Sequence, residues 1–95
     1  MPAVRWLSEA LGDIERLHAF LNDKNPEAAA KAVSLILKGA ILLKNAPRVG
    51  HPMPDETGRR ELFMAFGAGA YVLRYMPEKT GVVVIRVWHS REERR

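Results

Sequence analysis

The residues with the clearest chemical potential gather in the last third of the chain. A histidine between two arginines could supply a base, an acid and phosphate-binding cations, as cleavage of RNA at its 2′-hydroxyl requires. Arginines around an aromatic side chain are equally suited to binding a protein, and a third interpretation is a solvated rim that closes the last strand. The set consists of Arg60, Arg74, Arg86, Trp88, His89 and Arg91.

Other kinds of chemistry have little support in the sequence. The chain has no cysteine, and its histidines, His18, His51 and His89, lack the short spacing of metal ligands. Gly67-Ala68-Gly69 is followed by a strand pattern instead of a helix, so it is typical of a hairpin turn and not of a dinucleotide-binding loop. We therefore expect no metal ion and no cofactor.

Positive charge is concentrated in the second part of the chain. Up to Gly58, seven basic residues balance seven acidic ones, whereas eight basic and four acidic residues follow from Arg59 onward. The second part therefore carries the whole net charge of +4. Such an asymmetry favours an acidic partner, either a protein or a nucleic acid.

The length of 95 residues allows one domain, which we expect to span residues 1–95. No apolar run approaches the roughly 18 residues that cross a bilayer, and no basic segment with an apolar signal core begins the chain. We expect a cytoplasmic protein that does not enter a membrane.

Hydrophobic spacing predicts a short edge strand at 3–6, followed by two helices. The first helix is expected at about 9–22, with the Ser8 hydroxyl as its N-cap. The second should begin after Asn25 as its cap and end near Asn45. The short connection between them predicts an antiparallel hairpin.

The rest of the chain is predicted to form a loop and three strands. The proline- and glycine-rich segment 45–58 is predicted to be a loop, in which His51 is solvated. Strands are expected at about 60–66, 70–76 and 82–89. The predicted order is β-α-α-β-β-β, an α+β fold in which a helical hairpin packs on a small antiparallel sheet.

The second helix has apolar residues on more than one face. One stripe should face the sheet, whereas Leu35 and Leu42, on the side of Lys31 and Lys38, should contact the first helix or a partner protein. The stripe consists of Ala29, Val33, Ile36, Leu37, Ala40 and Leu43.

Alternation assigns the strand residues to two faces of the sheet. Tyr71, Leu73 and Tyr75 should share one face, with Val72, Arg74 and Met76 on the other. In the last strand Val83, Ile85, Val87 and His89 should lie opposite Val84, Arg86 and Trp88. We expect Arg74 and Arg86 to point away from the helix-covered core, and the polar segment 90–95 to add little to the stability of the fold.

The order of these elements resembles a known family. The sequences Arg60-Glu61-Leu62, Tyr71-Val72-Leu73-Arg74-Tyr75 and Val82–Arg91, which reads VVVIRVWHSR, are similar to the three strands of the ParE branch of the RelE/ParE toxin superfamily. The resemblance spans nearly the whole chain. It implies the toxin of a type II toxin–antitoxin pair of the plasmid-stabilisation type, which binds DNA gyrase so that the cleaved-DNA complex persists and replication stops.

The resemblance also distinguishes two branches. RelE-like nucleases cleave mRNA on the ribosome with an arginine directly after the first aromatic residue of the second strand and with a tyrosine after the basic tail. In this sequence Val72 stands where the nucleases have the strand arginine, and the chain ends at Arg95 without the tail tyrosine. Arg91, however, matches the tail arginine of the nucleases, and His89 lies near a histidine of some relatives. The ParE-like function is therefore expected, without catalysis. The RelE-like nuclease and a non-toxic binding module are the alternatives.

The resemblance implies two binding surfaces. A ParD-like antitoxin with an acidic, initially disordered segment should wrap the toxin, and direct sequence-specific binding of nucleic acid is not expected. Residues expected to contact gyrase are Arg60, Arg74, Arg86, Trp88, His89 and Arg91. Residues expected to contact the antitoxin are Leu35, Lys38, Leu42, Arg74 and Arg86.

Overall fold

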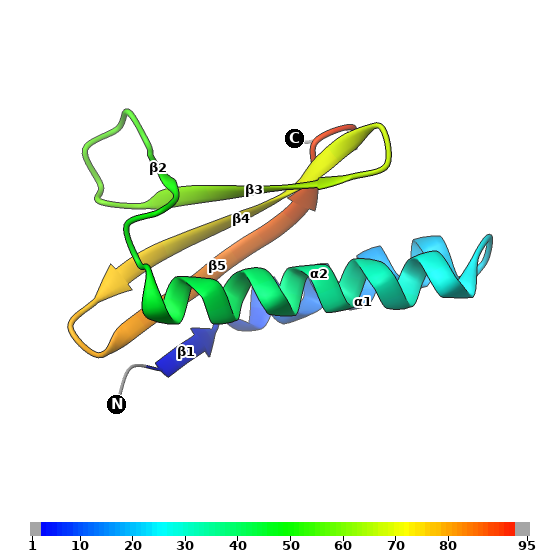
Figure 1. The fold of residues 1–95 in the computed structure, drawn as a ribbon, viewed down its shortest axis with the longest axis horizontal. Helices are drawn as coiled ribbons and strands as arrows, with labels where there is room; N and C mark the ends of the chain where they lie inside the picture. The colour runs from blue at the N-terminus through cyan, green and yellow to red at the C-terminus, as the bar shows by residue number, and fades with distance from the viewer. Residues whose placement is uncertain (1–2, 93–95) are drawn as a thin grey trace.

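The computed structural model describes residues 3–92 of the 95-residue chain. Two helices and five strands follow each other in this part (Figure 1). They are β1 (Ala3–Trp6), α1 (Ser8–Asn22), α2 (Pro26–Asn45), β2 (His51–Pro52), β3 (Arg60–Phe66), β4 (Gly69–Glu78) and β5 (Gly81–His89).

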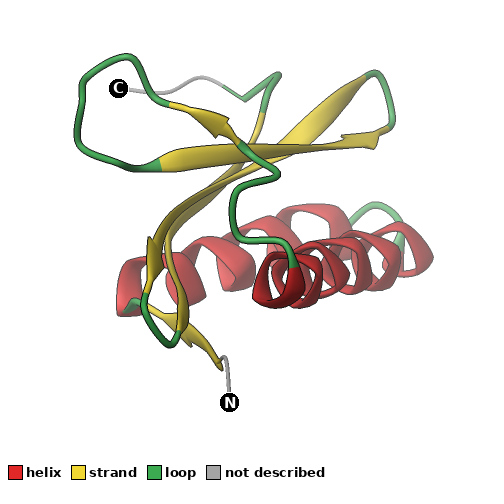
Figure 2. Ribbon diagram, turned by 60° about the vertical axis from the view of Figure 1, so that its left-hand side comes forward, coloured by secondary structure: helices red, strands yellow, loops and turns green. Residues whose placement is uncertain are grey.

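The five strands form one sheet in the order β1-β5-β4-β3-β2. β1 pairs parallel with β5, and all other neighbours are antiparallel. The α1–α2 hairpin covers one face of this sheet (Figures 1 and 2). The predicted α+β fold and the order β-α-α-β-β-β are therefore confirmed, with β2 as an addition. The sheet is mixed, however, and not wholly antiparallel as predicted, because β1 runs parallel to β5.

The addition corrects the prediction that His51 lies in a loop. His51 and Pro52 pair with Glu61 and Arg60 as a two-residue edge strand, and the His51 ring lies edge-on to Phe63, with 6.0 Å between the ring centroids. A proline is tolerated there because an edge strand leaves some N–H positions unpaired. Two residues are too few for a periodic pattern, so the sequence could not reveal this strand.

The two helices begin differently. Asn25 caps α2 as predicted, because its side chain accepts a hydrogen bond from the Ala28 amide, and Pro26 follows at the first helical position. The prediction that Ser8 caps α1 is wrong. Ser8 is already helical, and the capping position belongs to Leu7, which has no polar side chain to offer the helix.

A β-bulge in β5 breaks the predicted alternation. Arg74 faces Arg86, whereas Tyr75 faces Val84, so Ile85 is an extra residue in β5. The bulge reverses the phase of the strand: Val82 and Val84 before it, and Val87 after it, all pack in the core. The predicted grouping of Val83 and Ile85 with Val87 is therefore wrong.

The core lies between α2 and the central strands. Ile36 and Leu43 of α2 and Leu73 and Tyr75 of β4 are fully buried, as apolar side chains of this size are when they hold a small domain together. Three assignments on α2 are corrected, however. Val33 and Leu37, predicted for the core, lie outside it, and Leu37 is 43% exposed. Leu35, predicted for the opposite surface, packs against the core.

Candidate functional site

Arg60, the first of the predicted site residues, anchors a loop. Its guanidinium donates hydrogen bonds to the carbonyl oxygens of Arg48 and Gly50, at 3.0 and 2.6 Å. These carbonyls belong to the segment that connects α2 to β2. Arg60 therefore holds this connection against the start of β3.

Tyr75 fixes the same connection from inside the core. Its hydroxyl donates to the carbonyl oxygen of Pro47 at 2.7 Å and accepts from the Gly50 amide at 2.9 Å. A Cβ atom at Gly50 would lie 2.7 Å from this hydroxyl, so the approach requires glycine. Burial raises the pKa of Tyr75, which keeps the hydroxyl neutral.

Arg74 lies on the sheet face that the helices leave uncovered. Its guanidinium pairs with Glu61 of β3 at 2.8 and 2.9 Å, and it stacks 4.9 Å from the centre of the Trp88 ring. Trp88 is nearly buried. Arg74 and Trp88 therefore meet, as recognition of a partner would require, but the charge of Arg74 is already balanced by a neighbouring strand.

Arg86 is bound to α1 through Asp13, which corrects the expectation that it points away from the helices. Its Nε and Nη2 atoms donate to the two carboxylate oxygens of Asp13 at 2.8 and 2.9 Å. The Val87 amide donates to the same carboxylate at 2.8 Å. Because β1 pairs only with Gly81–Val84, the following part of β5 forms an open sheet edge, and Asp13 takes the place of a neighbouring strand there.

The environment of Asp13 favours its charged form. Only 4% of this residue is exposed, and burial alone would raise its pKa. The hydrogen bonds from Arg86 and from the Val87 amide, together with the charge of Arg86, outweigh burial and hold the pKa below its ordinary value. The same hydrogen bond raises the pKa of Arg86.

His89 uses both ring nitrogens within the fold. Its Nδ1 accepts a hydrogen bond from the Arg91 amide at 3.2 Å, which leaves Nε2 to donate to the Phe66 carbonyl oxygen at 3.0 Å. The ring also lies edge-on to Tyr71, with 5.0 Å between centroids. His89 therefore ties the end of β5 to the β3–β4 hairpin.

The segment after β5 is more firmly attached than the sequence suggested. Ser90 exchanges hydrogen bonds with Ala70 through its backbone amide and its hydroxyl. Glu92 pairs with Arg16 of α1 at 2.5 Å and accepts from the His89 amide at 3.2 Å. Residues 90–92 are therefore tied to β4, β5 and α1, whereas the small effect of the segment on stability stays a prediction, and residues 93–95 lie outside the described part.

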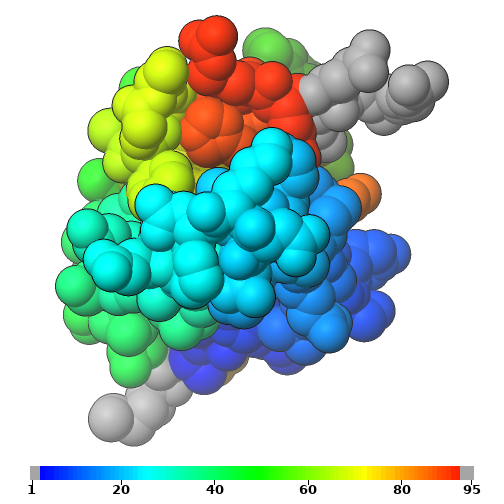
Figure 3. Space-filling model, turned by 90° about the vertical axis from the view of Figure 1, so that its right-hand side faces the viewer, coloured from blue at the N-terminus to red at the C-terminus, as the bar shows by residue number. Residues whose placement is uncertain are grey.

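One pocket lies where this segment meets α1, and we call it the end pocket. Figure 3 looks onto this end of the molecule, where the turn between β3 and β4 (yellow) and the residues that follow β5 (red) lie beside the helix ends (cyan). The pocket has a volume of about 600 Å³. Its lining consists of Arg16, Leu17, Phe20, Leu21, Phe66, Gly67, Ala68, Tyr71, His89, Arg91 and Glu92.

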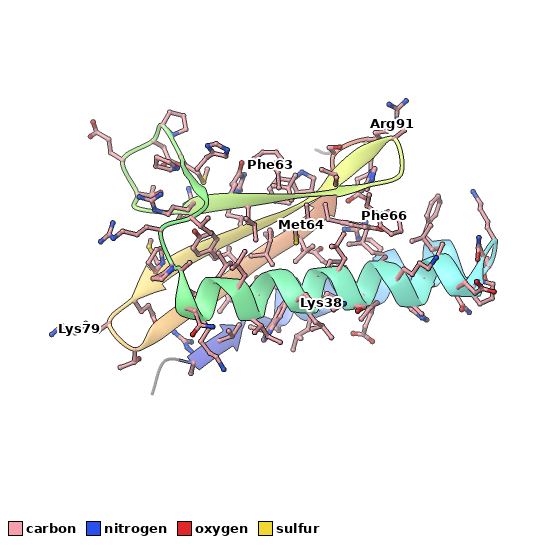
Figure 4. The ribbon with its side chains drawn as sticks, in the orientation of Figure 1. Lys38, Phe63, Met64, Phe66, Lys79 and Arg91 are labelled. Atoms are coloured by element: carbon pink, nitrogen blue, oxygen red, sulfur yellow. The ribbon has the colours of Figure 1, made fainter. Side chains whose placement is uncertain are left out.

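Arg91 differs from the other predicted arginines. Its side chain is exposed at the rim of the end pocket, and its guanidinium forms no ion pair with any residue of the described range 3–92. Figure 4 shows Arg91 at one end of the sheet and Lys79 at the other. Of the six residues predicted to contact the target, Arg91 has the guanidinium that is most available for a partner.

A second, shallower groove lies on the outer side of the helical hairpin. It has a volume of about 440 Å³ and is lined by His18, Ala30, Val33, Ser34, Leu37, Lys38 and Ile41. Lys38, predicted to contact the antitoxin, lines this groove (Figure 4). Leu42 is 48% exposed and Ile41 is 56% exposed, so this side of α2 keeps apolar surface available.

The six predicted target residues therefore do not converge on one point. Arg60 holds a loop, Arg74 and Trp88 meet on the uncovered sheet face, Arg86 is bound to α1, and His89 and Arg91 lie at the end pocket. Within the described residues, no group of three or more His, Asp or Glu side chains is placed to hold a metal ion. No helix in this range is long and apolar enough to cross a bilayer.

The sequence reasoning missed Asp13, Arg16 and Glu92. One signal was available for Asp13, because it lies three residues after Ala10 and four before Leu17, on the buried stripe of α1. A charged residue in such a stripe requires a partner. Its two strongest partners, however, are Arg86 and Val87, which lie 73 and 74 residues away in sequence, and no local pattern identifies them.

Comparison with known proteins agrees with this fold. Residues 4–94 match the family described as ParE toxin of type II toxin-antitoxin system, parDE. Among curated proteins, Toxin RelE3 of Caulobacter vibrioides is 35% identical over 94 residues, which is 99% of this chain and 100% of the relative. Toxin RelE1 of the same organism is 37% identical over 82 residues, 86% of either chain.

Two solved structures are similar as well. One is the chromosomal ParDE toxin–antitoxin system of P. aeruginosa, with a TM-score of 0.74, 21% identity, and coverage of 94% of this chain and 96% of that one. The other is the RelBE2 toxin–antitoxin complex of Mycobacterium tuberculosis, with a TM-score of 0.59 and 29% identity. This match covers 94% of this chain and 99% of that one. With the match over residues 4–94, the chain belongs to the ParE toxin family of type II toxin–antitoxin systems, within the RelE/ParE superfamily.

Proposed function

We propose that this toxin acts by binding DNA gyrase in the cytoplasm and prolonging its cleaved-DNA complex, without chemistry of its own. The main support for this proposal is that the candidate catalytic groups already form ion pairs or hydrogen bonds with other residues of the fold. Arg74 pairs with Glu61, Arg86 pairs with Asp13, and both ring nitrogens of His89 have partners.

Cleavage of RNA would need a different arrangement. The reaction requires cations over the phosphate and an acid and a base that can exchange protons with the substrate. Val72, at the position where the nucleases are expected to carry an arginine, is only 2% exposed and pairs with Trp88 across the strands. A substrate would have to break the contacts of Arg86 and His89 to use them.

Binding to a protein needs none of these rearrangements. The uncovered sheet face offers the stacked pair of Arg74 and Trp88, together with the 52% exposed side chain of Phe63. Aromatic and arginine side chains are the residue types that contribute most to protein interfaces. Arg91 adds an available cation at the end of the same sheet.

We also propose that an antitoxin neutralises this toxin. The solved relatives from P. aeruginosa and M. tuberculosis are both toxin–antitoxin systems. An acidic amphipathic segment suits the outer side of α2, where Leu42 and Ile41 are exposed and Lys38 lies beside them. Binding there should weaken with added salt but persist, because apolar burial is insensitive to screening.

The second candidate is the ribosome-dependent nuclease. It is favoured by the names of the two curated relatives, Toxin RelE3 and Toxin RelE1. In this alternative His89 and Arg91 would act at the end pocket, after His89 had released the Phe66 carbonyl. Substitution of His89 would then abolish cleavage of RNA.

The test uses purified protein in two assays in parallel. We expect cleaved DNA to accumulate when gyrase is incubated with supercoiled DNA and the toxin, and ribosome-bound mRNA to remain intact. Arg91→Ala should weaken the effect on gyrase, whereas Lys79→Ala, which removes one charge at the opposite end of the sheet (Figure 4), should not. His89→Ala should be mild.

Other outcomes would contradict the proposal. Cleavage of mRNA that is lost in His89→Ala would establish the nuclease instead. If induced expression did not arrest growth and neither assay responded, the chain would be a binding module without toxicity. Induced expression with a DNA-repair response, in contrast to immediate loss of translation, would support gyrase as the target in cells.

A further inference from the structure

The end pocket has the size and enclosure of a small-molecule site. Its volume of about 600 Å³ falls inside the range of about 300–1,000 Å³ that is typical of ligand pockets. Three separate parts of the chain enclose it: α1, the turn between β3 and β4, and the segment that follows β5. Such sites are apolar with a few polar groups that orient the ligand.

The walls of the end pocket are mainly apolar and aromatic. Leu17 and Leu21 come from one face of α1, and Phe66 comes from the end of β3. The Phe20 ring stands at the opening, 63% exposed, with the Lys24 ammonium 4.4 Å from its centre. An apolar ligand would remove this surface from water, which is the main driving force for binding at such a site.

Tyr71 provides a polar group inside this apolar surface. The residue is only 2% exposed, yet its hydroxyl has no hydrogen-bond partner among residues 3–92. No side-chain oxygen or nitrogen in this range is both fully buried and unpaired, so the hydroxyl must open into the pocket that Tyr71 lines. Burial, and to a smaller extent the negative charge of Glu92, raises the pKa of Tyr71, so the hydroxyl stays protonated and can donate a hydrogen bond.

The rim of the end pocket favours a negative charge. Arg16 is neutralised by Glu92 and Asp13. Arg91 has no ion pair within the described residues, so it leaves one positive charge at the opening. A guanidinium binds a carboxylate through two parallel hydrogen bonds, and the adjoining apolar surface partly excludes water from such a pair.

We propose that the end pocket binds small amphipathic carboxylates, with the apolar body between α1 and the β3–β4 turn and the carboxylate on Arg91. The Tyr71 hydroxyl donates a hydrogen bond to an acceptor of the ligand. This site is independent of whether the toxin acts on gyrase or on mRNA. A bound carboxylate would cover Arg91 and would therefore compete with any macromolecular target that uses this residue.

The experiment is a titration of the isotope-labelled full chain with 2-naphthoate, followed by NMR. We expect saturable shifts for amides at the pocket, including Gly67, Ala68 and Arg91, with a dissociation constant on the order of 1 mM or lower. The neutral analogue 2-naphthamide should bind more weakly, because it cannot pair with a guanidinium.

Three variants make the assignment specific. Arg91→Gln should weaken binding of 2-naphthoate about tenfold, and Tyr71→Phe about threefold. Lys79→Gln removes the same charge at the far end of the sheet and should leave the affinity unchanged. Each variant is compared with the unliganded spectrum of the parent, so a loss of fold is seen directly.

The proposal is overturned by any of three results. The shifts could fail to saturate below about 10 mM, or they could cluster around Phe63 on the uncovered sheet face. Alternatively, 2-naphthamide could bind as tightly as 2-naphthoate while Arg91→Gln has no effect. That last result would show an apolar cavity without selectivity for a carboxylate.

Discussion

The carboxylate of Asp13 on α1 takes three hydrogen bonds from two consecutive residues of β5, two from the Arg86 guanidinium and one from the Val87 amide. A single side chain thereby joins the first helix to the open edge of β5. Arg16 adds a longer contact to the same carboxylate at 3.4 Å. The Arg16 guanidinium also forms an ion pair with Glu92. The arrangement links the helical hairpin to the segment that carries Arg91.

Removal of the Asp13 charge should destabilise the protein. We expect Asp13→Asn to lower the free energy of unfolding by about 1–3 kcal/mol, because a charge-assisted contact is lost while the half-exposed Arg86 remains partly solvated. Urea unfolding at neutral pH measures the change. Glu15→Gln removes an exposed charge from the same helix and should change stability by less than about 0.5 kcal/mol. Equal effects of the two substitutions would contradict the role of Asp13.

Acid should remove the contribution of the Asp13 charge to the free energy of unfolding. The pKa of Asp13 is lowered in the folded state, so its contribution to stability is complete above the ordinary carboxyl pKa near 4 and is lost as pH falls through the lowered value. Urea midpoints measured from about pH 7 to about pH 3 should therefore fall less steeply for Asp13→Asn than for the parent chain. Parallel curves for the two proteins would show that other carboxyl groups dominate.

The two tyrosines of β4 provide a matched comparison. The Tyr75 hydroxyl has two hydrogen bonds to the connection between α2 and β2, whereas the Tyr71 hydroxyl has none within residues 3–92. Tyr75→Phe should cost about 1–3 kcal/mol of stability because it leaves a buried amide and a carbonyl unpaired. Tyr71→Phe should cost less than about 0.5 kcal/mol. Thermal unfolding of both variants distinguishes the two sites.

A similar comparison applies to two glycines with positive φ. A Cβ atom at Gly81 would lie only 1.8 Å from the Ala3 carbonyl oxygen, whereas at Gly67 it would meet nothing within 4 Å. Gly67→Ala should cost about 1–2 kcal/mol from backbone strain alone. Gly81→Ala should cost about 3 kcal/mol or more, because it also displaces β1 from the sheet. Hydrogen exchange at the Leu7 amide, which donates to the Val84 carbonyl oxygen, would report the release of β1.

The sequence predicted all elements of this fold except β2, because each of the others leaves a local signal. The cap at Asn25 and the apolar spacing define α2, and alternation defines most of β4. Where no local signal exists, the prediction was wrong. One extra residue, Ile85, reverses the faces of β5, and its presence follows from how β5 pairs with β4, not from the composition of β5 itself.

The candidate site was harder to predict for the same reason. Composition identified arginines that could bind a partner, but it could not show that Arg60 would hold two carbonyls or that Arg86 would meet Asp13. Whether an arginine side chain is available to a partner depends on its long-range contacts within the fold, and only the structure reveals these contacts. The roles of the predicted residues in binding gyrase or an antitoxin remain predictions.

The position of β5 between β1 and β4 has a consequence for synthesis of the protein. The ribosome makes β1 first and β5 last among the described strands, and β1 has no other neighbour in the sheet. The sheet therefore cannot close until residue 89 has left the ribosome exit tunnel, because β5, the strand that joins β1 to β4, is missing before then. During translation the nascent chain should lack the assembled surface, so a cell would have the whole synthesis time of the toxin to provide a binding partner.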